Sequence, residues 1–428
     1  MKILIAGAGL SGLHSAWRLK EAGHEVVVFD ARDRVGGRTY STPLANGVIV
    51  DHGALTIRSE DHALRGLCAE LEIEMIGIGF PVGRWEVGLD EHHTVDEVSW
   101  LYEALGARAH ARIANGDGDE SLDAAFEAVV GQDYRTHPTY LNTTAALSVP
   151  LDRLSANGFV AQYFGSVWGS DEHAEDGAFD PGIVEHASRI HGGNQRPATE
   201  LARRLGDAVR LGSPVVNVTQ DADSVTFELA DGSTVHGDGA IIALPLPLLR
   251  ELKLGFALPL QMRRAIDTLV MGASAMANFA LETPGRPECA AEPTEWWTAC
   301  TWASASNELA SESAVTAFFG TDPVIDRVLE GGPEVAQARV SAVLPGCTFP
   351  EAPDIVITDW RTEEWSRGSY PNWGVGWDPE MNEAFAQRVV GRVAISGADT
   401  SGAFVGGMEG AVKTGRIAAT QLLEKLTP

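Results

Sequence analysis

Three glycines and one acid near the start of the chain have the types and spacing of a phosphate- and ribose-binding site. Gly7, Gly9 and Gly12 form a G-x-G-x-x-G motif directly after an apolar run, and Asp30 closes the next apolar run. Gly7 would permit a tight turn, Gly9 a close approach of backbone to a pyrophosphate, and Gly12 close packing of helix on strand. Because a carboxylate at Asp30 suits ribose hydroxyls, the pattern predicts a dinucleotide ligand.

The elements that would position these residues form a βαβ unit. Residues 3–6 and 26–29 are predicted to be parallel strands. The residues between them are predicted to form a helix with Leu10, Leu13, Ala16 and Trp17 on one face. Free N–H groups and the positive end of the dipole at the start of this helix would face a diphosphate.

A second glycine-rich loop follows the acid and favours a long ligand. Residues 31–39 read ARDRVGGRT, which places Gly37 and Arg38 shortly after Asp30, Ala31 and Arg32. With this loop the chain resembles the FAD-dependent (flavin monoamine) amine oxidase family, whose members carry the same run from the acid to G-G-R. The resemblance implies FAD as the cofactor in place of NAD, bound through these residues.

Further blocks occur in the order found in that family. They include a small-residue loop after 48–51, a diglycine at 192–193, a helix at 197–205, a strand at 209–218, and two C-terminal glycine segments. The resemblance implies that these blocks contact the cofactor through Gly53, Ala54, Val215, Trp360, Gly397, Asp399, Gly407 and Met408. Val215 would meet the adenine. The helix from about 408 to 423 would turn its N-terminus toward the flavin and stabilise negative charge on the reduced cofactor.

The resemblance also implies a catalytic position and marks several departures. Tyr370 matches one wall of the aromatic pair that flanks the substrate amine, where π faces orient the nitrogen. Gly407 stands where the second wall is usual, which opens space for a bulkier substrate. Ser369 replaces the cysteine that bonds to flavin in monoamine oxidases, so noncovalent FAD is expected. Ala398 replaces the usual glutamate, with Asp399 beside it as a substitute.

Met276 is the most informative departure. In amine oxidases this position is normally a lysine that holds a water near flavin N5 and is linked to the reaction of reduced flavin with oxygen. A methionine can neither donate nor hold a proton, and no lysine lies between Lys253 and Lys413. We therefore expect slow reoxidation by oxygen and dehydrogenase behaviour.

The expected fold class is α/β, with a Rossmann-like FAD-binding domain and an inserted α+β substrate-binding domain, the flavin amine oxidase fold. The FAD-binding domain would be discontinuous and comprise residues 1–80, 185–255 and 390–428. The substrate-binding domain would comprise residues 81–184 and 256–389. A chain of 428 residues has enough material for two or three domains.

Charge and composition narrow the class of partner. With 32 basic and 59 acidic residues the net charge is −27, which argues against nucleic acid as a partner.

No stretch reaches the roughly 18 apolar residues of a membrane helix, and neither a signal peptide nor a C-terminal membrane anchor is expected. Four scattered cysteines without a C-x-x-C pair fit reduced thiols, so a cytoplasmic location is expected. No metal site is predicted. The oligomeric state stays open, with a homodimer among the options.

The main functional hypothesis is an FAD-dependent oxidoreductase acting on a small-molecule amine or amino acid. It would oxidise the C–N bond by hydride transfer to flavin N5 and give an imine, with oxygen or another acceptor reoxidising FAD. Two alternatives stay open. One is a C–C or ring desaturase of the phytoene desaturase or protoporphyrinogen oxidase type. Met276 and Gly407 favour this desaturase, whereas Tyr370 favours oxidation of an amine. The other is a catalytically impaired flavoprotein.

Overall fold

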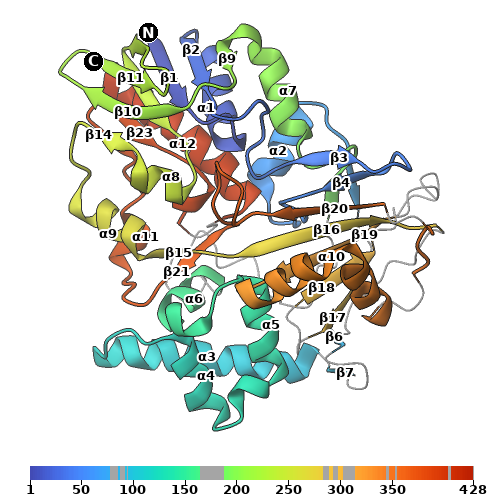
Figure 1. Cartoon of the computed structure of the whole chain (residues 1–428). Helices are drawn as coiled ribbons and strands as arrows, with labels where there is room; N and C mark the ends of the chain where they lie inside the picture. The colour runs from blue at the N-terminus through green and yellow to red at the C-terminus, as the bar shows by residue number, and fades with distance from the viewer. Residues whose placement is uncertain are drawn as a thin grey trace.

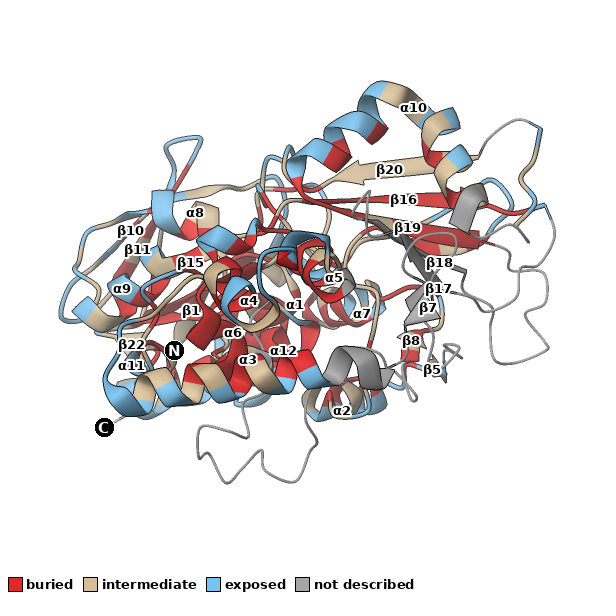
Figure 2. Cartoon of the chain, turned by 90° about the horizontal axis from the view of Figure 1, so that it is seen from below, coloured by how far each residue is buried: buried red, intermediate tan, exposed pale blue. Residues whose placement is uncertain are grey.

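The computed structural model describes residues 1–77, 85–86, 92–93, 95–163, 188–282, 289–292, 297–301, 314–343, 347–351, 354–402 and 406–427. These residues form two regions (Figure 1). One is built around a six-stranded sheet that gathers both chain ends, and the other combines a five-stranded sheet with a group of helices. Figure 2 shows that buried residues concentrate in the strands and on the inward faces of the helices.

The six-stranded sheet takes its strands from both ends and the middle of the chain. Its order is β22-β23-β13-β1-β2-β9; the neighbours from β23 to β9 are parallel, and β22 is antiparallel at the edge. The strands are β1 (Lys2–Ala6), β2 (Glu25–Phe29), β9 (Val209–Arg210), β13 (Gly239–Ile242), β22 (Val389–Val390) and β23 (Val393–Ile395). Nearly every residue of the four central strands is buried, as parallel strands covered on both faces require. The predicted βαβ unit is confirmed.

Four helices cover one face of this sheet and share one apolar core. They are α1 (Leu10–Glu21), α2 (His62–Glu70), α7 (Arg196–Leu205) and α12 (Met408–Leu426). The predicted core faces are buried, for example Leu13 on α1, Leu67 on α2 and Leu422 on α12. Helices α1 and α12 lie side by side, so residues from opposite ends of the chain meet beneath the sheet (Figure 1).

The other face packs against a smaller sheet and three short helices. The sheet order is β12-β11-β10-β14, with β10 (Val215–Gln220), β11 (Val225–Leu229), β12 (Thr234–Gly237) and β14 (Lys253–Leu254). The helices are α8 (Leu246–Glu251), α9 (Leu260–Thr268) and α11 (Glu380–Glu383). The single strand expected at 209–218 is therefore wrong. Gly212, at φ +61°, and Pro214 separate β9 from β10, and the two strands join different sheets.

The second region has a five-stranded antiparallel sheet, ordered β17-β18-β19-β16-β20. Its strands are β16 (Ser274–Ala280), β17 (Cys289–Glu292), β18 (Trp297–Thr301), β19 (Ala314–Gly320) and β20 (Ile355–Asp359), and α10 (Asp322–Val343) packs on one face. Cys289 lies opposite Cys300 in the strand register, so two cysteines that are scattered in the sequence are cross-strand neighbours. The helices α3 (Val95–Asn115), α4 (Leu122–Val130), α5 (Pro138–Leu147) and α6 (Ala156–Tyr163) form a separate apolar cluster.

In the described ranges, four further strand pairs lie outside the three larger sheets. They are β3 (Ser41–Pro43) with β4 (Ile49–Asp51), β5 (Met75–Gly77) with β8 (Ser188–Ile190), β6 (Trp85–Glu86) with β7 (His92–His93), and β15 (Leu269–Met271) with β21 (Pro371–Trp373). Helices α9 and α11, assigned from sequence to the substrate domain, share a core with the first sheet. The boundaries expected near 80 and 185 lie outside the described residues, and the domain division stays a prediction. Within the described part of the chain, no helix combines the length and the apolar character needed to cross a membrane.

Candidate active site

A cleft lies where the parallel strands end. It is lined by the residues that follow β1, β2, β13 and β23, which is where open α/β sheets bind ligands. The lining includes most of the residues predicted to bind a cofactor, namely Gly7, Gly9, Asp30, Ala31, Arg32, Gly37, Arg38, Ala54, Gly397, Gly407 and Met408. The structure therefore brings together segments from the two ends of the chain at one site.

The first glycine turn leaves room for a ligand above a tightly packed base. Gly7 has φ +103°, and a Cβ there would lie 2.5 Å from the carbonyl oxygen of Ala243. A Cβ on Gly12 would lie 2.0 Å from the carbonyl oxygen of Gly7, so both positions require glycine. Gly9, by contrast, faces open space with no heavy atom within 4 Å of a built Cβ. The turn is closed below and open above, as a pyrophosphate requires.

The start of α1 supplies the donors for that site. Gly9 is the N-cap of α1, and no side chain caps the first turn. The amide groups of this turn are therefore free to bind an anion, and the helix dipole favours negative charge there. Because a diphosphate needs this combination of glycine backbone and free amides, the residues present fit a dinucleotide cofactor.

Asp30 is held in place by backbone donors on either side. Its Oδ2 accepts from the Ala8 amide at 2.6 Å and its Oδ1 from the Arg32 amide at 2.9 Å. Burial raises the pKa of the Asp30 carboxyl, and these two hydrogen bonds oppose that shift. Each oxygen keeps a free lone pair, so the carboxylate is pre-oriented to accept from ribose hydroxyls in the cleft.

The second glycine loop rests directly on the first. The Gly36 amide donates to the Ala8 carbonyl at 2.9 Å, and Gly9 and Gly36 form an isolated parallel bridge. A Cβ on Gly37 would lie 3.5 Å from the Cα of Gly9. The two loops thus make one continuous backbone surface, which is the arrangement the sequence predicts for a long ligand.

The C-terminal segments complete the opposite side. Gly397, at φ +133°, follows β23, and Gly407 is the N-cap of α12 with no side-chain cap. The Gly406 amide donates to the Ala398 carbonyl at 2.9 Å, which joins the two segments into one turn. The first amides of α12 are consequently free at the cleft, next to Met408.

Arg38 reaches this turn through an ion pair. Its Nη2 donates to Asp399 Oδ1 at 2.5 Å, and its Nη1 donates to the Ser369 carbonyl at 2.7 Å. The second oxygen of Asp399 accepts from the Leu246 amide at 2.8 Å. Asp399 is buried behind the cleft and is absent from its lining, so it orients Arg38. A direct contact between Asp399 and the cofactor stays a prediction.

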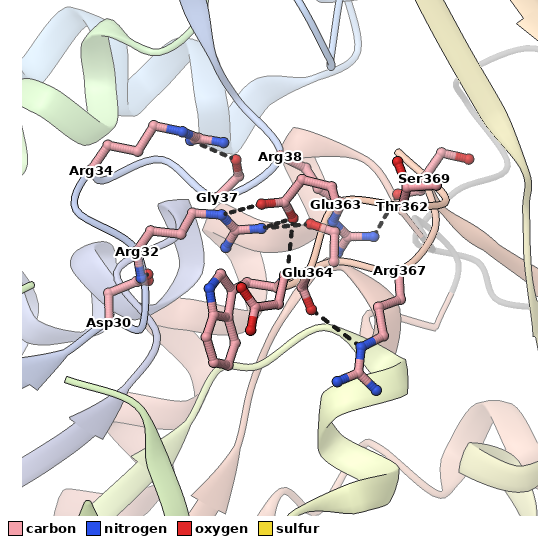
Figure 3. A network of polar contacts seen from close by, with 12 residues as sticks. Asp30, Arg32, Arg34, Gly37, Arg38, Thr362, Glu363, Glu364, Arg367 and Ser369 are labelled. Carbon is pink, nitrogen blue, oxygen red and sulfur yellow. Dashed lines mark hydrogen bonds and ion pairs between the residues drawn. The ribbon is translucent and has the colours of Figure 1, made fainter. Parts of the chain in front are cut away.

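Residues 360–369, which we call the strap, cross from the second region to the cleft. Arg32 donates from Nε to Glu363 Oε1 at 3.1 Å, and from Nη2 to Glu363 Oε2 at 2.5 Å and to Ser366 Oγ at 2.8 Å. Figure 3 shows Arg32 and Arg38 extending from the N-terminal loop toward the strap. Trp365 and Ser366 line the cleft. The sequence analysis singled out neither residue, although both lie between Trp360 and Ser369, which it did name.

Besides Gly12 and Asp399, three more predicted binding residues lie outside the cleft lining. The Trp360 indole donates to the His52 carbonyl at 2.6 Å, and a Cβ on Gly53 would meet both the Arg38 carbonyl and the Trp360 ring. Trp360 and Gly53 therefore support the loop that presents Ala54. Val215 begins β10 next to the core. Cofactor contacts by these three residues stay predictions.

Met276 lies in β16, outside the cleft lining, and its place in the strand shows which way its face is turned. Its neighbours Ala275 and Ala277 pack in the core beneath α10, so strand alternation places Met276 on the opposite face with Asn278. The Asn278 amide donates to the Asp51 carbonyl at 3.1 Å, just before the loop at 52–54. Thr358, opposite Met276 on β20, forms a hydrogen bond with the His52 ring at 2.8 Å. These contacts put the Met276 side of β16 against the loop that carries Ala54.

Tyr370 links the strap to the second region. Its hydroxyl donates to the Ala146 carbonyl and lies 3.2 Å from Ser148 Oγ, both at the C-terminal end of α5. Burial raises the pKa of Tyr370 to about 12, so the phenol stays neutral at physiological pH. A Cβ on Gly406 would lie 2.6 Å from the Cβ of Tyr370, which places the tyrosine beside the turn that precedes α12.

The fold and cleft define a dinucleotide-binding oxidoreductase class, and the comparisons with known proteins name the family. Residues 120–423 match the family described as flavin containing amine oxidoreductase, and residues 5–71 match an NAD(P)-binding Rossmann-like domain. The chain belongs to the flavin-containing amine oxidoreductase family. It is an FAD-dependent oxidoreductase that acts on the C–N bond of amines.

Individual relatives cover nearly the whole chain. An L-amino acid dehydrogenase of Synechocystis is 24% identical over 98% of this chain and 94% of its own. A probable flavin-containing monoamine oxidase A of Dictyostelium discoideum is 23% identical over 99% of this chain and 98% of its own. The solved cyclohexylamine oxidase of Brevibacterium oxydans has the same fold, with a TM-score of 0.81, 20% identity and coverage of 100% and 99%. This family assignment does not favour the desaturase alternative.

Proposed function

We propose that this protein is an amine or amino acid dehydrogenase that holds FAD noncovalently and transfers electrons to an acceptor other than oxygen. When bound, FAD would supply the hydride acceptor for oxidation of the carbon next to nitrogen. The substrate would be a small molecule. A cytoplasmic location remains an expectation from the cysteine pattern.

Different residues of the chain would bind different parts of FAD. The free amides at the start of α1 would hold the diphosphate, and Asp30 would accept from the ribose. The free amides at the start of α12 would stabilise negative charge on the reduced ring system. Ser369 stands where a covalent link would need cysteine, and its Oγ donates to the Gly272 carbonyl at 3.1 Å. The hydroxyl therefore has a structural partner, which supports noncovalent binding.

Tyr370 would position the substrate amine. Its neutral phenol is anchored to α5, so the ring has a fixed orientation beside the Gly406 turn. A π face held in this way would orient the nitrogen lone pair and keep the reacting carbon in place. Gly407 leaves the opposite position without a side chain, which favours a substrate bulkier than a simple linear amine.

The single observation behind the dehydrogenase assignment is Met276 on β16. The resemblance implies a lysine there that holds a water for the oxygen reaction, and a thioether cannot do so. Met276 is 2% exposed, and its strand neighbours leave its face turned toward the loop at 52–54. A proton-handling group is therefore missing at the position that would promote reaction with oxygen.

The test is the rate at which the reduced enzyme reacts with oxygen. Stopped-flow mixing of anaerobically reduced protein with air should give slow flavin reoxidation, while an artificial acceptor dye should give fast reoxidation. Met276→Lys should accelerate the oxygen reaction at least about tenfold, and Met276→Leu, which keeps an apolar side chain, should leave it unchanged. Wild-type reoxidation as fast as that of a lysine-bearing relative would overturn the proposal.

A further inference from the structure

A second buried arginine, Arg388, lies behind the cleft and has no acidic partner within ion-pair distance among the described residues. It precedes β22 and is 4% exposed. The only resolved influence on its pKa is burial, which lowers the value to about 10. Because an unpaired buried cation is costly, its retention calls for a compensating use.

The guanidinium of Arg388 is directed at the turn that forms one wall of the cleft. Its Nη2 donates to the Thr400 carbonyl at 2.8 Å, and its Nη1 lies 3.3 Å from the Ile395 carbonyl and 3.4 Å from Thr400 Oγ1. The Thr400 amide donates in turn to the Gly397 carbonyl at 3.2 Å. Gly397 lines the cleft, so one short turn separates the Arg388 charge from the ligand space.

The same turn shows that the Arg388 charge is not neutralised locally. Its single acid, Asp399, is already paired with Arg38 and with the Leu246 amide. The Nε of Arg388 is buried and has no hydrogen-bond partner among the described residues. Carbonyl oxygens accept the other nitrogens, which satisfies donors without cancelling the charge.

We propose that the uncompensated charge of Arg388 stabilises reduced FAD in the cleft and so raises the reduction potential of the bound cofactor. The inference rests on FAD occupying this cleft. A buried charge acts over a longer range than an exposed one because little water screens it. It adds to the dipole of α12, which points the same sign of charge at the cleft.

The test is the two-electron reduction potential of the bound FAD, measured anaerobically against a reference dye. Arg388→Met removes the charge and keeps much of the volume. It should shift the equilibrium between oxidised and reduced FAD about tenfold toward the oxidised form, which corresponds to about 30 mV for a two-electron couple. The matched control is Arg392→Met. Arg392 also donates to carbonyls, those of Ala222 and Asp238, but lies at the other end of β23 from Gly397. It should leave the potential unchanged.

A purely structural role predicts a different pattern. If Arg388 only fastens the turn, Arg388→Met would weaken FAD binding or stability and leave the potential of bound FAD at the wild-type value. That result would overturn the proposal, as would equal shifts in the two methionine variants.

Arg388→Lys tests the charge separately and also serves if Arg388→Met fails to retain FAD. A lysine buried there loses its proton at a lower pH than an exposed lysine does. Near pH 6 the reduction potential of FAD bound to Arg388→Lys should equal that of wild type at the same pH. Toward pH 9, where the lysine is neutral, it should fall below the wild-type value. A constant difference across this range would contradict the proposal. Failure of all variants and wild type to bind FAD would instead refute the assignment of the cleft.

Discussion

Two walls of the cleft are built in different ways. We call the first the glycine wall: the turns at 7–12 and 36–37, where backbone packs against backbone and a methyl group added at Gly7, Gly12 or Gly36 would collide. The second is the strap at 360–369, which contacts with distant parts of the chain hold in place, among them the Arg32 side chain and the His52 carbonyl. Arg32 and Glu363, the main link, are 331 positions apart. The glycine wall therefore depends on the local fold, whereas the strap depends on a few ion pairs and hydrogen bonds that can be removed individually.

The largest effect is expected in the glycine wall. Gly12→Ala places a methyl group 2.0 Å from the Gly7 carbonyl oxygen, and neither backbone can move without disturbing the α1–β1 packing. We expect a loss of about 3 kcal/mol or more in the free energy of unfolding of the protein without cofactor. Urea unfolding of the cofactor-free protein measures it.

The matched control is Gly9→Ala in the same motif. No atom lies within 4 Å of the added carbon, so stability of the cofactor-free protein should change by less than about 0.5 kcal/mol. FAD affinity should nevertheless fall roughly tenfold or more, because the methyl group occupies space needed by the diphosphate. If both variants lost only FAD affinity, or both lost only stability, then Gly12 and Gly9 would not have separate packing and binding roles.

The next effect concerns the link between strap and N-terminal loop. Glu363→Ala leaves Arg32, which is 9% exposed, without its carboxylate. We expect FAD dissociation to accelerate about tenfold, equivalent to about 1.4 kcal/mol, since Trp365 and Ser366 would lose their fixed position over the cleft. Dilution of the holoenzyme, followed by flavin fluorescence, gives the rate.

Glu251→Ala tests a more exposed ion pair of the same strap. Glu251 pairs with Arg367, and their side chains are 62% and 42% exposed, so removal should change the rate less than twofold. Equal rates in the two variants would mean that the ion pairs do not hold the strap. Tighter FAD binding in Glu363→Ala would mean that Arg32 is free to bind the cofactor itself.

The same division explains how much could be predicted from sequence. The glycine wall was predicted almost completely, because Gly7, Gly9 and Gly12 act through their own backbone and short-range packing. In the strap, only Trp360 and Ser369 were singled out from the sequence. Nothing local to Glu363 indicates Arg32 as its partner, and Asp399 was assigned a cofactor contact although the structure shows it paired with Arg38.

Residues held by long-range packing left no readable pattern. Arg388 lies in an ordinary run before two valines, and its burial depends on the turn at Thr400 and on the fold around β23. The strand predicted at 209–218 failed for a local reason, since Gly212 and Pro214 interrupt it. The order of the segments that resemble the family could be read from the sequence. Whether a given side chain lines the cleft or supports a residue that does depends on three-dimensional packing.

The smallest expected effect is a pH dependence that separates the walls. Burial lowers the pKa of both His14 and His52 to about 4. His14 belongs to the glycine wall's helix α1, where its Nδ1 lies 2.8 Å from the Val412 carbonyl. The His52 ring lies 2.8 Å from Thr358 Oγ1 on β20, and the backbone carbonyl of His52 accepts from the Trp360 indole at the start of the strap. An unfolded histidine gains a proton below pH 6.5, and the folded one stays neutral until about pH 4. Each therefore stabilises the fold fully above pH 6.5 and loses that contribution as the pH falls toward 4.

At pH 5.5 each histidine should already have cost the fold roughly 1 kcal/mol relative to pH 7.5. His14→Gln and His52→Gln should both flatten the pH dependence of the unfolding free energy by about that amount, measured by urea unfolding at the two pH values. FAD dissociation from wild type should also accelerate at pH 5.5. Only His52→Gln should remove that acceleration, because a charged His52 ring would disturb the adjoining backbone carbonyl that accepts from Trp360 of the strap. An equal effect of His14→Gln on dissociation would show that the two walls open together as one unit.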